Sequence, residues 1–183
     1  MIRKTTKEIL ADSFIELTAS KPINKITITN ITDNCGMTQP TFYRHFKDKY
    51  DLIAFIYVSD IRQLTDKIGV NGYEWRDALA ESLEYFVEKR DFALNALKHT
   101  GGRDAFLLQM ETTNIEMMSA VVRKKLMTEK IPEDISVMIQ FYCCGYTHFI
   151  CNWLLTNMQI PQNRAVDYME KCLPSLLRPY LYP

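Results

Sequence analysis

Hydrophobic residues recur at three- and four-residue intervals along most of the 183-residue chain, which is the spacing of one helix face. Residues 26–29 are rich in β-branched side chains that favour strands, but Ile31 follows Ile28 at a helical spacing. We find no convincing run of alternating polar and apolar residues. The pattern therefore predicts an all-α protein of about nine helices, covering residues 4–20, 27–35, 38–46, 48–68, 75–89, 91–99, 103–128, 133–157 and 162–180.

Proline, glycine and capping residues indicate where these helices begin and end. Pro22 ends the first helix, since proline cannot continue one, and Thr27 and Thr38 can cap the next two. The Gly and Asn residues within 69–72 form the strongest boundary signal along the chain. The expected organisation is an N-terminal domain over residues 1–50, a connecting helix over about 48–68, and a C-terminal domain over 51–183.

The second and third expected helices have the spacing of a helix-turn-helix unit. The turn between them, residues 35–37, is three residues long and contains glycine. In such a unit the second helix of the pair enters a DNA major groove by its N-terminal end, which must be small and polar. Gln39 can pair with adenine, and the Pro40 ring can pack on a thymine methyl. The residues of this kind are Thr38, Gln39, Pro40 and Thr41, with Tyr43 and Arg44 about one turn later and Lys49 placed for a phosphate.

Charge is distributed unevenly, although the chain as a whole is neutral. Residues 1–50 contain eight basic and five acidic side chains, whereas the remaining residues contain 14 basic and 17 acidic ones. A basic N-terminal region on an acidic body favours a nucleic-acid ligand, and a dimer would present two such regions.

Composition narrows the class of protein further. No apolar segment follows the basic N-terminus as in a signal peptide, and no run of 18 apolar residues could span a membrane. The five cysteines have spacings that match neither a zinc site nor a disulfide framework. We therefore expect a cytoplasmic protein with free thiols, no metal and no cofactor. His148 shares a helix face with Cys144 and Cys151, but a buried histidine among thiols is favoured over a metal site.

Catalytic motifs are missing from the sequence. It has no G-x-S-x-G, no H-E-x-x-H and no phosphate-binding glycine loop. We therefore expect a binding protein and not an enzyme. A helical adaptor that does not bind DNA is a further alternative, and the residues at 38–49 argue against it.

The residues that predict DNA binding also resemble those of a known protein family. The run Gly36-Met37-Thr38-Gln39-Pro40-Thr41-Phe42-Tyr43-Arg44-His45-Phe46-Lys47-Asp48-Lys49 resembles the signature of the tetracycline-repressor (TetR) family. The spacing of Ile28 and Ile31 is also similar, although the family usually has alanine where Thr32 stands. The resemblance covers residues 3–56 and implies an all-α dimer with a variable C-terminal body. It places Thr27, Thr41, Tyr43, His45 and Lys49 at the DNA backbone, and Thr38, Gln39, Pro40 and Arg44 at or beside base edges.

More loosely, the chain is similar to the branch of this family that regulates dihydroxyacetone kinase genes. The likeness lies in residues 25–32, residues 43–52 and the aromatic helix around residues 142–153. That branch includes activators that work through a kinase-like protein partner.

The helix expected over residues 133–157 is apolar on nearly every side, so it must be buried on nearly every side. One chain of this size offers few places to bury it. We therefore expect a C2 homodimer, formed by this helix and the next, on a pseudo-palindromic operator. The expected interface residues are Tyr142, Tyr146, Phe149, Ile150, Trp153, Leu173, Leu176 and Leu177.

Two mechanisms of regulation stay open. A kinase-like protein could dock on the body, because few polar residues fall on inward helix faces where they would recognise a ligand. Alternatively, a small hydrophobic molecule could enter the body, move the helix over 48–68 and release a repressor from DNA. The residues that would line such a pocket are Phe92, Phe106, Met110, Met117 and Tyr142, and an ordinary core explains them equally well.

Overall fold

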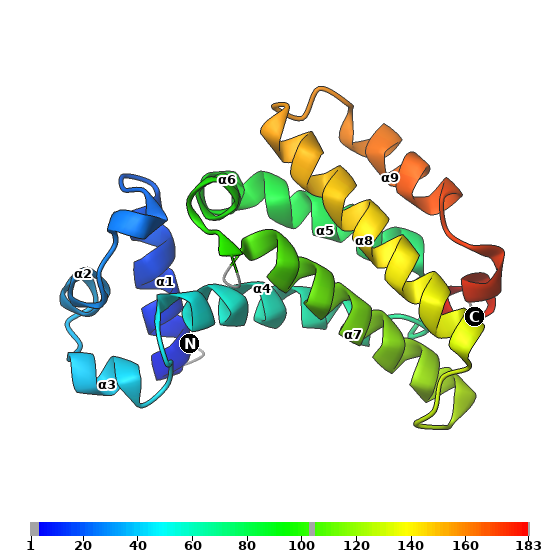
Figure 1. Cartoon of the computed structure of the whole chain (residues 1–183), viewed down its shortest axis with the longest axis horizontal. Coiled ribbons are helices and arrows are strands. Elements are labelled where there is room, and N and C mark those ends of the chain that lie inside the picture. The colour runs from blue at the N-terminus through cyan, green and yellow to red at the C-terminus, as the bar shows by residue number, and fades with distance from the viewer. Residues whose placement is uncertain (1–3, 103–104, 183) are drawn as a thin grey trace. The chain divides into compact units, whose positions relative to one another are not determined.

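The computed structural model describes residues 4–102 and 105–182, and all regular structure within them is helical (Figure 1). No strand occurs in this part of the chain, which confirms the all-α expectation. The expected start of a helix at residues 103–104 lies outside the described residues. In order, the elements are α1 (Thr6–Thr18), η1 (Ile23–Lys25), α2 (Ile28–Asn34), α3 (Gln39–Tyr43), α4 (Lys49–Asp66), α5 (Trp75–Glu88), α6 (Arg90–His99), α7 (Phe106–Leu126), α8 (Glu133–Leu155), α9 (Gln162–Lys171), η3 (Ser175–Leu177) and α10 (Arg178–Leu181).

The chain divides into two compact units. The first contains Met1–Tyr57 and Lys89–Phe106, and the second contains Val58–Glu88 and Leu107–Pro183. α4 begins in the first unit and ends in the second. α6 belongs to the first unit, whereas the division expected from the sequence assigns it to the C-terminal domain. The Phe92 ring of α6 explains the difference, because it is buried and meets the Phe14 ring edge-on, with 6.3 Å between centroids.

The first unit is built around the apolar faces of α1, α2 and α3. Leu10, Phe14, Ile31 and Phe42 are completely buried. A buried hydrogen bond adds to this packing, since the Ser13 hydroxyl of α1 donates to the Ile31 carbonyl of α2 at 2.7 Å. Together these contacts fix α2, and α3 after it, against α1.

Local sequence sets the ends of α2 and α3 as expected. The Thr27 hydroxyl accepts a hydrogen bond from the Asn30 N–H, and the Asn30 side chain accepts one from the Thr27 N–H. Thr38 caps α3 by accepting from the Thr41 N–H. Gly36 lies between the helices with a φ of +67°, a left-handed conformation that glycine adopts without a steric penalty.

Buried polar contacts join the helices of the second unit, in which α8 and α9 lie side by side (Figure 1). The Trp75 indole of α5 donates to the Tyr142 hydroxyl of α8 at 2.9 Å, and that hydroxyl donates to the Met169 carbonyl of α9 at 2.9 Å. The Asn114 amide of α7 donates to the Thr147 hydroxyl of α8 at 2.9 Å. These bonds specify how apolar helices pack, because a buried polar group without its partner is destabilising.

One helix differs from the expectation. The single helix expected over residues 162–180 is wrong, since α9 ends at Lys171 and is followed by the separate turns η3 and α10. Pro174 is the physical cause, because its missing N–H and its ring do not allow a helix to continue. Among the described residues, no helix combines the length and hydropathy needed to cross a membrane.

Candidate nucleic-acid interface

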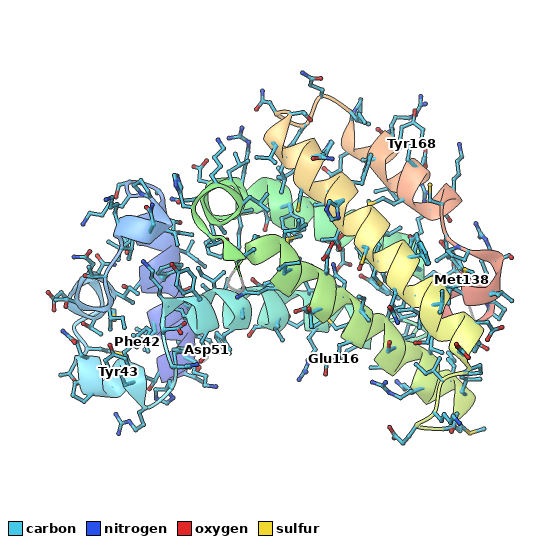
Figure 2. The ribbon with its side chains drawn as sticks, viewed as in Figure 1. Phe42, Tyr43, Asp51, Glu116, Met138 and Tyr168 are labelled. Carbon is cyan, nitrogen blue, oxygen red and sulfur yellow. The ribbon has the colours of Figure 1, made fainter. Side chains whose placement is uncertain are left out.

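α3 is anchored by aromatic rings on one side and presents polar residues on the other. Phe42 is buried, and its ring centroid lies 5.7 Å from that of Phe46, which is also buried. Tyr43, the next residue in the chain, is 56% exposed (Figure 2). A five-residue helix is not stable alone, so packing of these rings positions its outer face. The exposed predicted contacts on and beside α3 are Thr38, Gln39, Pro40, Tyr43 and Arg44.

Hydrogen bonds link these exposed side chains. The hydroxyls of Thr38 and Thr41 lie 3.0 Å apart, and the Arg44 guanidinium donates to the Thr41 hydroxyl at 3.4 Å. The Gln39 amide donates to the Thr29 hydroxyl of α2 at 2.8 Å. The polar face of α3 is therefore ordered before any ligand binds, which lowers the entropy cost of binding.

Thr29 is a residue that the sequence reasoning missed. It is exposed in the first turn of α2 and orients the Gln39 side chain. The sequence feature that could have indicated this role is a second threonine two residues after the Thr27 cap. The remaining predicted contacts differ in exposure, since Thr27 is exposed whereas Thr41 and His45 are half-buried. Contact of all these residues with DNA stays a prediction.

Lys49 has a different environment from the one expected. Its ammonium donates to the carbonyls of Ile23, Asn24 and Ile26 at 2.8, 3.2 and 2.9 Å. An ammonium has three hydrogens, so all its donors are used within the protein. Burial lowers the pKa of Lys49 from its ordinary value, whereas the three carbonyl oxygens favour the charged form. The geometry gives Lys49 the role of holding the loop before α2, and it leaves no hydrogen for a phosphate.

Asn95 of α6 holds the same loop from another side. Its amide nitrogen donates to the Thr18 and Lys21 carbonyls at 2.9 and 2.7 Å, and its oxygen accepts from the Ile23 N–H at 2.8 Å. Both polar groups of the Ile23 backbone are thus bonded by side chains, one from α4 and one from α6. The segment that leads into α2 is therefore positioned by helices that follow it in the chain.

The five residues expected to line a ligand pocket differ in burial and in neighbours, and their sharing of one pocket stays a prediction. Phe92 and Phe106 pack edge-on in the first unit, with centroids 6.0 Å apart, and both are buried. Met110 is buried in the second unit with its sulfur 4.0 Å from the Cys151 sulfur. Met117 and Tyr142 line two different hollows. Tight ring and sulfur packing makes Phe92, Phe106 and Met110 core residues.

The expected dimer residues separate into an inner and an outer set. The polar atoms of two inner residues are used within the chain, since Trp153 donates to the Ile160 carbonyl at 2.7 Å and Tyr142 bonds to Met169. The inner residues are already buried within one chain, and their contact with a second copy stays a prediction. The inner set is Tyr142, Ile150, Trp153, Leu173 and Leu177, and the outer set, partly or fully exposed, is Tyr146, Phe149 and Leu176.

The cysteines are free thiols in several environments. Burial raises the pKa of Cys143 and Cys151 to about 12 each, so both are protonated and unreactive near neutral pH. Cys172 is exposed. The expectation of a buried His148 among thiols is wrong, because this side chain is exposed and its Nδ1 lies 3.0 Å from a Glu111 carboxylate oxygen on the neighbouring helix α7. In the described part of the chain, no group of three or more His, Cys, Asp or Glu side chains could hold a metal ion.

Two family models match the chain. Residues 12–55 match the model for "Bacterial regulatory proteins, tetR family", and residues 73–175 match the model for "Transcriptional regulator C-terminal region". The first match spans the second half of α1, α2, α3 and the start of α4, and the second covers more than half of the chain.

One relative agrees with these models. The chain is 26% identical over 87 residues to the HTH-type dhaKLM operon transcriptional activator DhaS of Lactococcus lactis subsp. lactis (strain IL1403), covering 48% of this chain and 46% of the relative. The chain therefore matches about half the length of that relative.

Two solved structures share the fold. One is the dihydroxyacetone kinase operon activator DhaS, with a TM-score of 0.66 at 16% identity over 96% of this chain and 98% of that one. The other is a TetR transcriptional regulator from Rhodococcus sp. RHA1, with a TM-score of 0.65 at 14% identity over 93% of each chain. With the helix-turn-helix geometry of α2 and α3 and the two family models, these matches place the chain in the TetR family of DNA-binding transcription regulators.

Proposed function

We propose that the protein binds double-stranded DNA as a homodimer, with α3 of each copy in a major groove of a pseudo-palindromic operator. The observation that best supports this is the ordered polar face of α3 above Phe42 and Phe46. Thr38, Gln39, Pro40 and Arg44 would meet base edges. Thr27, Thr41, Tyr43 and His45 would meet phosphates and sugars, and Lys49 would add charge near the backbone.

The proposed dimer surface is the outer face of α8 with the adjoining part of α9. Phe141 is 74% exposed, which is unusual for so large an apolar side chain. Beside it lies a hollow of about 390 Å³ lined by Gly145, Phe149 and Tyr168. A two-fold axis here would pair the same patch of both copies, so that each Phe141 could enter the hollow of the other. Leu176, 48% exposed, is a further predicted contact of this interface.

For regulation, we propose an activator of dihydroxyacetone kinase genes that responds to a kinase-like protein partner. The similarity to a relative named as a dhaKLM operon activator supports this assignment. The protein would act by binding and not by catalysis, in the cytoplasm. The second candidate is a repressor that a small hydrophobic molecule releases from DNA. The apolar hollow beside Phe149 would be the binding site for this molecule, provided that the dimer does not fill it.

A DNA-binding measurement on the full-length protein tests the first proposal. Gln39→Ala should relax base preference and weaken operator binding by about 1–3 kcal/mol, because the paired hydrogen bonds to adenine are lost. Gln159→Ala, an exposed glutamine of the second unit, is the matched control and should bind as the parent does. Equal operator affinity for the parent and Gln39→Ala would contradict the proposed contact. A reporter gene under the operator shows whether the protein raises or lowers expression. Capture of a kinase-like partner from native cells would support the activator.

A further inference from the structure

A second hollow in the second unit has charges that the DNA-binding role does not use. It encloses about 530 Å³ between the end of α4, the turn after it and α7. Small-molecule sites commonly have volumes in the range of about 300–1,000 Å³. We call this hollow the α4–α7 groove, with Arg62, Ile68, Glu116, Met117, Val121 and Lys124 as the lining residues used below.

The floor of the α4–α7 groove is apolar. Ile68, Met117 and Val121 line it and are themselves largely buried, so their exposed atoms face the hollow. Val70, at 49% exposure, is a large apolar side chain that also lines it. An apolar portion of a ligand would therefore be removed from water here, which is favourable in proportion to the area covered.

The rim of the groove is positively charged. Four cations line it, Arg62, Arg123, Lys124 and Lys125, against two carboxylates, Asp66 and Glu116 (Figure 2 labels Glu116 on α7). The groove therefore has a surplus of two positive charges. Such a surplus in a hollow with an apolar floor attracts anions more strongly than a flat surface would.

These cations also lack strong partners among the described residues. No ion pair within the described chain involves Arg62, Lys124 or Lys125, and Arg123 reaches only the fully exposed Glu129, at 4.0 Å. Elsewhere in the same unit, by contrast, Lys67 bonds to Glu81 at 2.8 Å and Arg76 pairs with Asp167 and Glu170. Unpaired guanidinium and ammonium groups beside an apolar floor are the arrangement that binds a carboxylate or phosphate.

We propose that the α4–α7 groove binds a small amphipathic anion, with its carboxylate or phosphate at Arg62 and Lys124 and its apolar part on Met117 and Val121. The inference is independent of DNA binding, because the groove is built from second-unit residues alone. It also differs from the hydrophobic-ligand alternative above in its place and in the charge of the ligand.

Calorimetric titration of the full-length protein without DNA tests the proposal. The probes are octanoate and octyl phosphate, with octan-1-ol as the neutral analogue and inorganic phosphate and acetate as head groups alone. At least one of octanoate and octyl phosphate should bind more than tenfold tighter than octan-1-ol. It should also bind more than tenfold tighter than acetate or inorganic phosphate, its head group alone, since charge and apolar contact are both required. Preference for octanoate or octyl phosphate identifies the head group.

Variants locate the binding. The double variant Arg62→Ala with Lys124→Ala should weaken binding of the octyl anion more than tenfold, and Ala120→Phe should block it by filling the hollow from an exposed position. Lys130→Ala with Lys171→Ala removes two exposed cations outside the lining and should leave the affinity within twofold of the parent. Failure of every probe to bind, equal binding of alcohol and anion, or parent-like binding by the groove variants would each overturn the proposal.

Discussion

Replacing Lys49 with methionine nearly preserves side-chain length and removes the ammonium that donates to the Ile23, Asn24 and Ile26 carbonyls. At a net contribution of about 1 kcal/mol for each hydrogen bond, the loss would be about 3 kcal/mol if all three carbonyls stayed unsatisfied. Water can reach part of this site because the side chain is half-buried, so we expect the free energy of unfolding to fall by about 2 kcal/mol. For a chain of this length, that corresponds to a melting temperature lower by about 4–8 °C.

Thermal unfolding of the full-length protein, followed by circular dichroism, measures this effect. Lys47→Met is the matched control, because Lys47 is exposed and its side chain makes no hydrogen bond or ion pair within the described residues. It should melt within about 2 °C of the parent, since exposed substitutions usually change stability by less than about 0.5 kcal/mol. If Lys49→Met melted like the parent while the salt dependence of DNA binding flattened by about one phosphate contact, Lys49 would be a phosphate ligand and our reasoning would be refuted.

Four further results are expected. Asn95→Ala should lower the free energy of unfolding by about 1–3 kcal/mol and weaken DNA binding, because the loop before α2 loses a support from α6; unchanged melting and gel-shift midpoints would contradict this. If the protein forms the proposed dimer, Phe141→Glu should make it monomeric in sedimentation equilibrium, since a carboxylate would be buried in the proposed interface; a variant that still dimerises would exclude that surface. In the monomeric Phe141→Glu variant, iodoacetamide at pH 8 should label the exposed Cys172 well before Cys143 and Cys151, as mass spectrometry can show. The raised pKa of Cys143 and Cys151 also contributes to the stability of the folded protein at neutral pH. This contribution is lost as pH rises from 9.0 towards about 12, because the thiols ionise first in the unfolded chain. If the urea midpoint did not fall between pH 8 and pH 10, the two thiols would not be buried as the structure shows.

The amino-acid order is sufficient to predict the helices and the helix-turn-helix unit. Thr27, Gly36 and Thr38 set helix ends through hydrogen bonds and dihedral preferences that involve residues only a few positions away. The burial of Phe42 and Phe46 also follows from their spacing of one helical turn. Such local interactions can be predicted from the order of the residues. The positions of α1–α8 therefore agree with the expectation to within a few residues.

Which apolar face of α8 turns inward depends on contacts with other helices. The residues of α8 are apolar nearly all round, so their spacing could not separate Tyr142 and Trp153, which are buried, from Phe141, which is exposed. The distinction depends on partners on other helices, such as Trp75 and Met169 for Tyr142. A hydrophobic pattern predicts how much surface must be covered but not which neighbour covers it.

The support of the DNA-binding unit was likewise decided by contacts distant in sequence. Lys49 bonds to Ile23 across 26 positions, and Asn95 bonds to it across 72. Neither side chain differs in type from an ordinary surface residue, and no local rule distinguishes a lysine that binds phosphate from one that binds carbonyls. Only the folding of α4 and α6 around the loop before α2 brings these donors and acceptors to within about 3 Å, the separation at which hydrogen bonds form.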